Sequence, residues 1–459
     1  MKHLYILLLL LPTWLSAQIS GQVQVGNSLR GLAGCTVKAY NSAAQLVATA
    51  TTSANGSYEL AVPAAQTVRV ELSLPAATVA GSMAWSLVGR QSRGRMVKSP
   101  ATIQNWQAHQ SYRSSVAAPR VATPVYLHAA TQAPEAAQQP AIVLSALAGS
   151  NRTALATFGQ VGAVWGLAHD APRRQVYAAT LAKRHVGFGP AGSGAIYRST
   201  VGTMANAQLL YDFDANGIAT RPAELERELA ATLGKAAKDA PIFSHIGQMS
   251  LGGIDLSADG RVLYVMNLYN RTLYGLYLKG TAKQLQVAGV VSYPLPVVTA
   301  KGGNWRPFAV KYHANRVFVG AVNDAAESQN AADATAIVWS LDPAQKQYTE
   351  VMRLPLNYPR ASAAMQWHPW TNDLNAAKQS AYPSYLAYAQ PILSDIEFDQ
   401  DGAMLLGLMD RFGHQTGTDQ PDLAGRGVYT GVAAGDVLRL ALQKPLTEAT
   451  QKQWSKTCG

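Results

Sequence analysis

Three glycines in the stretch AKRHVGFGPAGSGAIYRS, residues 182–199, have the spacing of a dinucleotide-binding loop. Gly187, Gly189 and Gly192 match Gly-x-Gly-x-x-Gly, which cradles a pyrophosphate only where a strand turns directly into a helix. Here Pro190 interrupts the glycines, and a β-type run without helical apolar spacing follows. The stretch therefore favours a loop between two strands over a phosphate site.

A second candidate site is the acidic turn DFDANG. Asp212, Asp214 and Asn216 occupy the first, third and fifth positions of a calcium-binding loop. The twelfth position is Ala223, where a calcium loop usually has a bidentate glutamate. A hairpin turn explains the stretch equally well. We expect no cofactor, and Ca²⁺ is the one cation that these three residues could hold.

Other catalytic signatures are missing from the sequence. It contains neither His-Glu-x-x-His nor Gly-x-Ser-x-Gly, so it lacks the motifs of zinc metalloproteases and α/β-hydrolases. Cys35 and Cys458 are the only cysteines, too few for a cysteine zinc site or a disulfide framework.

The charge pattern indicates which partners to expect. The chain has 38 basic and 27 acidic residues, a formal charge of +11, but only 14% of its residues are charged. Its densest basic stretch, Arg90 to Lys98, has neither interleaved aromatic residues nor a helical face, so we expect no nucleic-acid binding. The dilute excess of positive charge is compatible with attraction to acidic surface polysaccharide.

The first 17 residues have the pattern of an export signal. Lys2 and His3 precede an apolar run over 4–11, and Leu15-Ser16-Ala17 forms a small-residue cleavage site that would leave Gln18 as the first mature residue. The apolar run is too short to span a bilayer, and no second run of sufficient length follows. The sequence therefore predicts a secreted or cell-surface protein without a membrane span.

Residues 18–118 have the pattern of a small antiparallel β-sandwich. Short runs rich in Val, Thr and Tyr alternate with turn signals, and Asn55-Gly56 between two such runs predicts a hairpin. Residues 119–140 are rich in Ala, Pro and Gln, so we expect a linker there.

The stretch ISGQVQ…GLAGCTVKAYNSAAQLVATATTSANGSYELAV within this sandwich resembles the SdrD B-like, Cna B-type and carboxypeptidase-regulatory-like family. The resemblance implies a transthyretin-like sandwich that serves as a stalk or spacer on a secreted bacterial protein. Many of these modules bind calcium in an acidic loop after the first strand. The corresponding VGNSLRGLAG has no carboxylate, so we expect no metal in this domain.

From residue 141 to residue 459 a strand-turn-strand pattern repeats, followed each time by a loop and a second β run. The four copies begin at Gly166, Gly253, Pro307 and Asp395. Two hairpins per repeat are typical of a β-propeller blade, so the predicted fold class is all-β. One long interval has Pro222 followed by Leu225, Leu229 and Leu233, which predicts a short helical insertion.

This region resembles the propeller that is joined to SdrD B-like modules in secreted bacterial proteins. The resemblance is carried by VWGLAHD, KRHVGFGPAGSGAIY, QPILSDIEFDQDGAMLLGLMDRFGHQTG and GDVLRL. It implies an architecture and a location, and no established reaction. The sequence stops just after the outer strand of one blade, so we expect an incomplete propeller, truncated at the C-terminus.

In a propeller, the loops that join the second and third strands of each blade emerge on one face, where ligands usually bind. The stretch 365–391 opens on the same face and is rich in aromatic residues suited to stacking. The predicted ligand-binding residues are Arg184, His185, Trp367, Trp370, Tyr385, Asp410, Arg411 and His414. The alternative is that they brace the loops and fill a local core.

Two function classes remain open. The favoured one is an exported, non-enzymatic scaffold or binding protein whose propeller binds a surface polysaccharide or another exported protein. The alternative is a propeller hydrolase or lactonase that uses a divalent metal. Its candidate ligands are Asp255, Asp395, Glu397 and His414. A fold alone does not decide between these classes.

Overall fold

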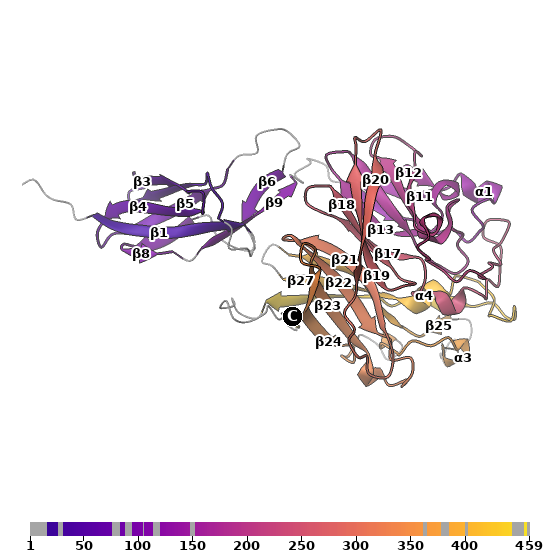
Figure 1. Cartoon of the computed structure of the whole chain (residues 1–459). Coiled ribbons are helices and arrows are strands. Elements are labelled where there is room, and N and C mark those ends of the chain that lie inside the picture. The colour runs from indigo at the N-terminus through magenta and orange to yellow at the C-terminus, as the bar shows by residue number, and fades with distance from the viewer. Residues whose placement is uncertain are drawn as a thin grey trace, which may run out of the picture. The chain divides into compact units, whose positions relative to one another are not determined.

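The structure is a computed structural model of the whole chain. It describes residues 16–25, 31–75, 83–87, 94–103, 105–112, 120–146, 152–360, 365–377, 385–399, 403–442 and 454–456. The chain divides into two compact units, Met1–Arg113 and Ser114–Gly459 (Figure 1). Residues 1–15 of the predicted export signal lie outside the described residues. No helix in the described part of the chain is long and apolar enough to cross a bilayer.

The first unit is a β-sandwich of two sheets. One sheet has the order β4-β1-β9-β6, with β8 beside β1, and the other has the order β3-β2-β5-β7. The strands of the first sheet are β1 (Ser16–Val25), β4 (Ser57–Pro63), β6 (Met83–Leu87), β8 (Ala101–Thr102) and β9 (Trp106–Tyr112). Those of the second are β2 (Thr36–Tyr40), β3 (Leu46–Thr51), β5 (Thr67–Ser73) and β7 (Gly94–Lys98).

The sandwich core follows from the alternation of apolar and polar residues along its strands. In β4 every second residue is buried, and Tyr58, Leu60 and Val62 meet Val68 and Val70 of β5 across the two sheets. Such alternation makes one face of each strand apolar, so the two faces can pack together and exclude water.

The turn at Asn55-Gly56 forms as predicted, but it does not make a hairpin. Its flanking strands β3 and β4 belong to different sheets, so the turn is a corner between the two layers of the sandwich. Gly56 has φ +78°, and a Cβ there would lie 2.2 Å from the carbonyl oxygen of Val23. The glycine is therefore required both by its backbone conformation and by this close approach.

The second unit begins earlier than predicted, because residues 119–140 are not a linker. They contain β10 (Arg120–Pro124) and α1 (Pro134–Ala137), and β10 pairs antiparallel with β11 (Pro140–Ala146). With β12 (Arg152–Thr157) these strands form a three-stranded sheet. The Ala, Pro and Gln content of this stretch does not predict a strand, because β10 is stabilised by pairing with β11 rather than by its own β propensity.

Four four-stranded sheets follow in chain order. They are β13 (Val164–Asp170), β14 (Gln175–Thr180), β15 (Ala195–Thr200) and β16 (Gln208–Asp212); β17 (Leu251–Leu256), β18 (Val262–Asn267), β19 (Thr272–Lys279) and β20 (Gln286–Pro294); β21 (Trp305–His313), β22 (Arg316–Asn323), β23 (Thr335–Asp342) and β24 (Gln347–Pro355); and β26 (Pro391–Phe398), β27 (Met404–Asp410), β29 (Asp436–Leu442) and β30 (Trp454–Lys456). Each sheet is an antiparallel meander, so the predicted repeat is confirmed.

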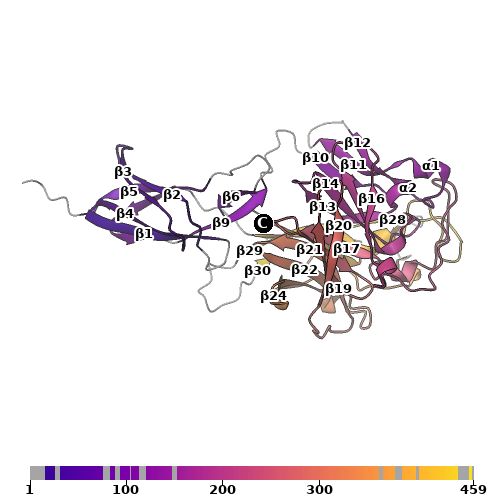
Figure 2. The same ribbon diagram turned by 45° about the horizontal axis from the view of Figure 1, so that its top comes forward.

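Successive sheets pack face to face, which makes the second unit propeller-like. The first strands of neighbouring sheets lie in contact, β13 with β17, β17 with β21, and β21 with β26. Figure 2 shows the sheets following one another from β10–β12 to β21–β24. A parallel pair, β25 (Tyr385–Ala387) and β28 (Thr430–Val432), and the short helices α2 (Phe158–Val161), α3 (Leu374–Ala377) and α4 (Arg411–Gln415) lie in the connections.

The predicted helical insertion is wrong. Residues 222–233 contain no helix, and their side chains alternate between exposed and half-buried positions. Leucines at i, i+4 and i+8 fit a period of two as well as a helix, so the pattern was ambiguous. The extended chain bonds to another segment instead, since Ala230 O accepts from Ala130 N at 2.8 Å and Gly234 N donates to His128 O at 3.1 Å.

Candidate functional site

The loops after the second strand of several sheets meet, as the repeat predicts. Arg184 N donates to His414 O at 3.0 Å, which joins the loop after β14 to the short helix after β27. Trp370 N donates to Asp324 O at 2.8 Å and so joins the stretch 365–377 to the loop after β22. Side chains from segments that lie more than 200 residues apart therefore share one region.

Most predicted ligand-binding residues in this region are buried. Only Tyr385, with 52% exposure, is open to solvent, whereas seven are at most 9% exposed. These seven are Arg184, His185, Trp367, Trp370, Asp410, Arg411 and His414. The two tryptophans therefore do not offer rings to a ligand as predicted. Their indoles fill the space between loops, and Trp370 Nε1 donates to Pro391 O at 2.8 Å.

Arg411 is a fully buried bracing residue. Each of its five N–H groups has an acceptor, although none of these is a carboxylate. The acceptors are the carbonyl oxygens of Ser244, Ile246 and Thr371 and the side-chain oxygens of Asn372 and Gln390. Burial lowers the pKa of Arg411 to about 9. Its hydrogen bonds leave the guanidinium no donor for a ligand, so it fixes the loops around it.

Arg184 and His185 brace the same layer of loops. The guanidinium of Arg184 donates to Lys238 O, Gln415 O and Pro421 O. His185 has φ +68°, and its backbone N–H donates to Asp239 Oδ2 at 2.8 Å. Neither of its ring nitrogens has a partner among the described residues. Burial, and then the charges of neighbouring cations, lower the pKa of His185 to about 2, so the ring is neutral.

The glycine loop of residues 187–194 serves packing. A Cβ on Gly189 would lie 2.4 Å from the hydroxyl of Tyr197 and 2.7 Å from the backbone of Val161. A Cβ on Gly194 would lie 2.8 Å from Asp214 Oδ2. The loop runs into strand β15 rather than into an α-helix, so it lacks the helix N-terminus that a dinucleotide site requires.

The polar side chains of the DFDANG turn form hydrogen bonds within the protein. Asp214 accepts from the hydroxyls of Ser193 and Thr220 at 3.1 and 2.6 Å, and from Thr220 N at 2.8 Å. Asp212 Oδ1 accepts from Ala215 N at 3.2 Å, and Asn216 donates to Asp212 O at 2.7 Å. Both carboxylates thus hold the turn itself.

Two of the candidate metal ligands, Asp255 and Glu397, lie on the first strands of their sheets, and both contact the same lysine. Lys311 Nζ is 2.6 Å from Glu397 Oε1 and 3.6 Å from Asp255 Oδ2. Among the described residues, no group of three histidine, cysteine, aspartate or glutamate side chains is placed to hold a metal ion. His414 lines a separate cavity, to which Asp255, Asp395 and Glu397 do not contribute.

That cavity is open to solvent and lies between Tyr126, Trp165 on β13, and the last described sheet of the second unit. Its volume is about 780 Å³, and the residues that give it chemical character are Tyr126, Trp165, Ser394, Asp410, His414 and Asp436. The His414 ring makes edge-to-face contacts with Tyr126 and Trp165, with centroids 6.1 and 5.9 Å apart. Three aromatic rings from three segments therefore form one wall.

Three ionisable groups at the cavity have pKa values shifted toward the neutral form, namely His414, Lys183 and Asp410. Burial lowers the pKa of His414 well below its ordinary value, and its Nδ1 has no partner among the described residues. Burial lowers the pKa of Lys183, behind the aromatic wall, to about 8. Burial raises the pKa of Asp410 to about 7, although hydrogen bonds from the backbone N–H groups of Gln390, Ala434 and Phe412 lower it. The wall therefore presents uncharged rings.

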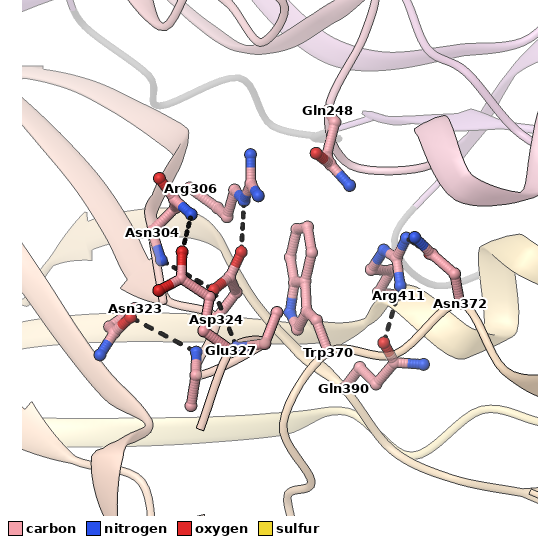
Figure 3. A network of polar contacts seen from close by, with 12 residues as sticks. Gln248, Asn304, Arg306, Asn323, Asp324, Glu327, Trp370, Asn372, Gln390 and Arg411 are labelled. Carbon is pink, nitrogen blue, oxygen red and sulfur yellow. Dashed lines mark hydrogen bonds and ion pairs between the residues drawn. The ribbon is translucent and has the colours of Figure 1, made fainter. Parts of the chain in front are cut away.

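A second polar centre surrounds Trp370 (Figure 3). Two guanidiniums face this indole, with Arg306 Cζ 5.7 Å and Arg411 Cζ 4.6 Å from the ring centroid. Arg306 Nε donates to Asp324 Oδ2 at 2.6 Å. None of these residues lines the cavity described above.

Trp165 and Arg306 were missed by sequence reasoning, although the repeat contains a signal for them. Each lies directly before the first residue of its repeat, and the equivalent positions in the other two repeats are Gly252 and Ser394. The first strand of each of the four sheets shifts its pairing register at this position or within two residues of it. Such irregularities re-aim side chains and often lie near functional sites.

Comparison with known proteins places the chain in no family. No protein-family model matches it. Colossin-A of Dictyostelium discoideum is 26% identical over 309 residues, 63% of this chain and 2% of Colossin-A. Colossin-D of the same organism is 24% identical over 269 residues, 56% of this chain and 26% of Colossin-D. The chain thus spans only a small part of the curated relatives that it matches.

Solved structures resemble the chain weakly. An auxiliary nutrient binding protein from Bacteroides thetaiotaomicron is 9% identical, with a TM-score of 0.27 over 91% of this chain and 70% of that protein. A putative 6-phosphogluconolactonase from Bacteroides uniformis is 8% identical, with a TM-score of 0.29 over 88% of this chain and 99% of that protein.

Proposed function

We propose that this chain is an exported, non-enzymatic binding protein whose propeller-like unit binds a neutral sugar of a surface polysaccharide. The observation that carries the proposal is the cavity of about 780 Å³ with its wall of Tyr126, Trp165 and His414. Pockets for small ligands typically have volumes of roughly 300 to 1,000 Å³ and combine apolar walls with a few polar groups.

The wall has the chemistry that a sugar ring needs. The C–H faces of a sugar pack against aromatic rings, while its hydroxyls need hydrogen-bonding partners. Here Trp165 and Tyr126 offer the rings. Ser394 and Asp436 add polar atoms to the lining. The neutral state of His414 supports an uncharged ligand over an anionic one.

For the first unit we propose the part of a spacer. Its two-sheet core is complete within residues 19–108, and its resemblance to SdrD B-like and Cna B-type modules supports a stalk on a secreted protein. We also propose that the N-terminal segment directs export of the protein. Neither unit supplies a reason to expect nucleic acid as a partner.

A metal-dependent hydrolase is not proposed. The Lys311 ammonium lies between Asp255 and Glu397, where it would repel a divalent cation. Asp255 Oδ2 also accepts from Tyr312 N at 2.8 Å. These carboxylates are therefore already used within the protein.

A glycan array probed with the full chain tests the proposal, followed by calorimetric titration of the best neutral glycan. We expect Trp165→Ala to weaken binding by ~1 to 3 kcal/mol, as for an aromatic anchor at the centre of an interface. Tyr385→Ala is the matched control, because this exposed ring is outside the cavity and its loss should leave affinity unchanged.

Trp165 also packs against Phe308, so its loss could disturb the fold. Val437→Arg provides a second variant, because Val437 lines the cavity yet is 74% exposed. It should block the entrance without a cost in stability. Binding of no neutral glycan, or glycan binding that both variants leave unchanged, would refute the proposal. A protein ligand that Val437→Arg releases would reassign the cavity to a protein partner.

A further inference from the structure

Arg306 is half-buried and has unused donors, in contrast to the fully buried Arg411. Its Nε donates to Asp324, but neither Nη atom has a partner among the described residues. The side chain is 18% exposed, whereas Arg411 is fully buried with all five donors bonded. A fixed guanidinium with two free terminal nitrogens presents two parallel N–H groups, the geometry that binds one carboxylate in a bidentate manner.

The position of Arg306 is set in advance by a rigid support. Asp324 is fully buried, and its Oδ1 accepts from Asn304 N at 2.8 Å and from Ala326 N at 3.1 Å. Because the carboxylate is fixed by backbone donors, it holds the guanidinium in one orientation. A ligand that binds Arg306 would therefore lose little free energy to ordering of the side chain.

The surroundings of Arg306 favour an anion. Arg411 lies on the other side of the Trp370 ring and has no carboxylate partner. Of the described carboxylates, only Asp324 hydrogen-bonds to either guanidinium, while the buried Asp410 acts on Arg411 through its charge. The exposed carboxylate of Glu327 is partly engaged, because its Oε1 accepts from Asn304 Nδ2 at 3.2 Å.

Amide groups line the same centre. Figure 3 shows the Gln248 side chain beside the free end of Trp370, in the space between Arg306 and Arg411. Gln248 Nε2 donates to Ser244 O at 3.0 Å, which leaves its Oε1 available as an acceptor. Amides hydrogen-bond well to hydroxyl groups, so a ligand with both a carboxylate and hydroxyls fits this centre better than a simple carboxylate does.

We propose that Arg306 is the carboxylate-binding residue of a second ligand site, which takes a uronic acid. The Nη1 and Nη2 groups of Arg306 bind the carboxylate, and the amide of Gln248 contacts a hydroxyl. The site is separate from the aromatic cavity and does not depend on it. An acidic peptide would satisfy Arg306 but would leave the amide without a hydroxyl partner, so the uronic acid is favoured.

Calorimetric titration of the full chain with glucuronate, and with glucose as the neutral match, tests the proposal. We expect glucuronate to bind and glucose not to compete. Arg306→Lys keeps a cation beside Asp324 but removes the fork, and should weaken glucuronate binding by about tenfold or more. Arg261→Lys is the matched control, because that side chain is 78% exposed, and it should leave binding unchanged.

Chemical protection gives a readout that does not depend on the folding of a variant. Phenylglyoxal reacts with accessible guanidiniums, so it should modify Arg306 and spare Arg411, and glucuronate should protect Arg306 in peptide mass spectra. Failure of wild-type protein to bind glucuronate at millimolar concentration, or equal binding by Arg306→Lys, would overturn the proposal. Tighter binding of N-acetylglutamate amide than of glucuronate would overturn it in favour of an acidic peptide. Trp165→Ala should leave glucuronate binding intact, which separates this test from that of the cavity.

Discussion

Replacing His185 with asparagine should make the second unit less sensitive to acid. His185 is 2% exposed, both ring nitrogens are without partners among the described residues, and burial lowers its pKa to about 2 from an ordinary value of 6.5. The unfolded chain therefore takes up a proton below pH 6.5 that the folded chain does not. Because the unfolded state binds more protons, this group costs stability as the pH falls.

The size of the effect follows from the two pKa values. Between about pH 7.5 and about pH 5.5, the unfolded histidine gains nearly one proton and the folded one gains almost none, so the folded state loses about 1.4 kcal/mol. Asparagine suits the test because, among residues that keep a side chain and do not titrate, it best tolerates the φ of +68° at this position.

Urea titrations at both pH values, followed by tryptophan fluorescence, measure the difference. The variant should lose about 1.4 kcal/mol less stability than the wild type on acidification, whatever its stability at neutral pH. His169→Asn provides the matched control, because His169 is exposed on β13 and its replacement should change the pH dependence less. Identical losses for the wild type and His185→Asn would show that the folded imidazole titrates normally, and would refute the reasoning.

Trp370→Ala should destabilise the second unit by about 3 to 5 kcal/mol, because the ring is 3% exposed and leaves a large cavity, whereas Tyr385→Ala should stay within about 0.5 kcal/mol; urea titrations compare the two. Gly189→Ala should cost about 1 to 3 kcal/mol or more, because the new Cβ would lie 2.7 Å from the backbone of Val161. Gly192→Ala meets open space at φ +74° and should cost about 1 kcal/mol, and a larger loss there than at Gly189 in thermal unfolding would contradict the packing account.

The sequence predicts the sheets well, because alternation and turn signals act locally. Each predicted strand-turn-strand repeat forms, and the loops that follow meet in space. The sequence does not predict which side of a loop faces water. Trp370 and Arg411 have the residue types of a binding surface, but each is enclosed by segments distant in the chain. Burial of this kind depends on tertiary contacts that no local pattern contains.

The aromatic wall illustrates a different limit. Tyr126 lies just after a strand that composition assigned to a linker, and Trp165 lies within a strand that was assigned correctly. Only the packing of Tyr126 and β13 near the last described sheet brings the two rings to His414. An alignment of the four repeats would have singled out Trp165 and Arg306 as unusual at a shared position, without showing which lines a cavity.

The shared register shift of the first strands gives each repeat one interior position whose residue type varies. The repeats carry Trp165, Gly252, Arg306 and Ser394 at this one level: an aromatic ring, no side chain, a cation and a hydroxyl. At Gly252 the carbonyl of Phe308 already occupies the space that a Cβ would need, so that repeat admits no other residue. At the other three positions a substitution would change the side chain that faces the interior, while the hydrogen-bonded pairing of the rest of the sheet would remain. Each further copy of this repeat would therefore add one more variable interior position.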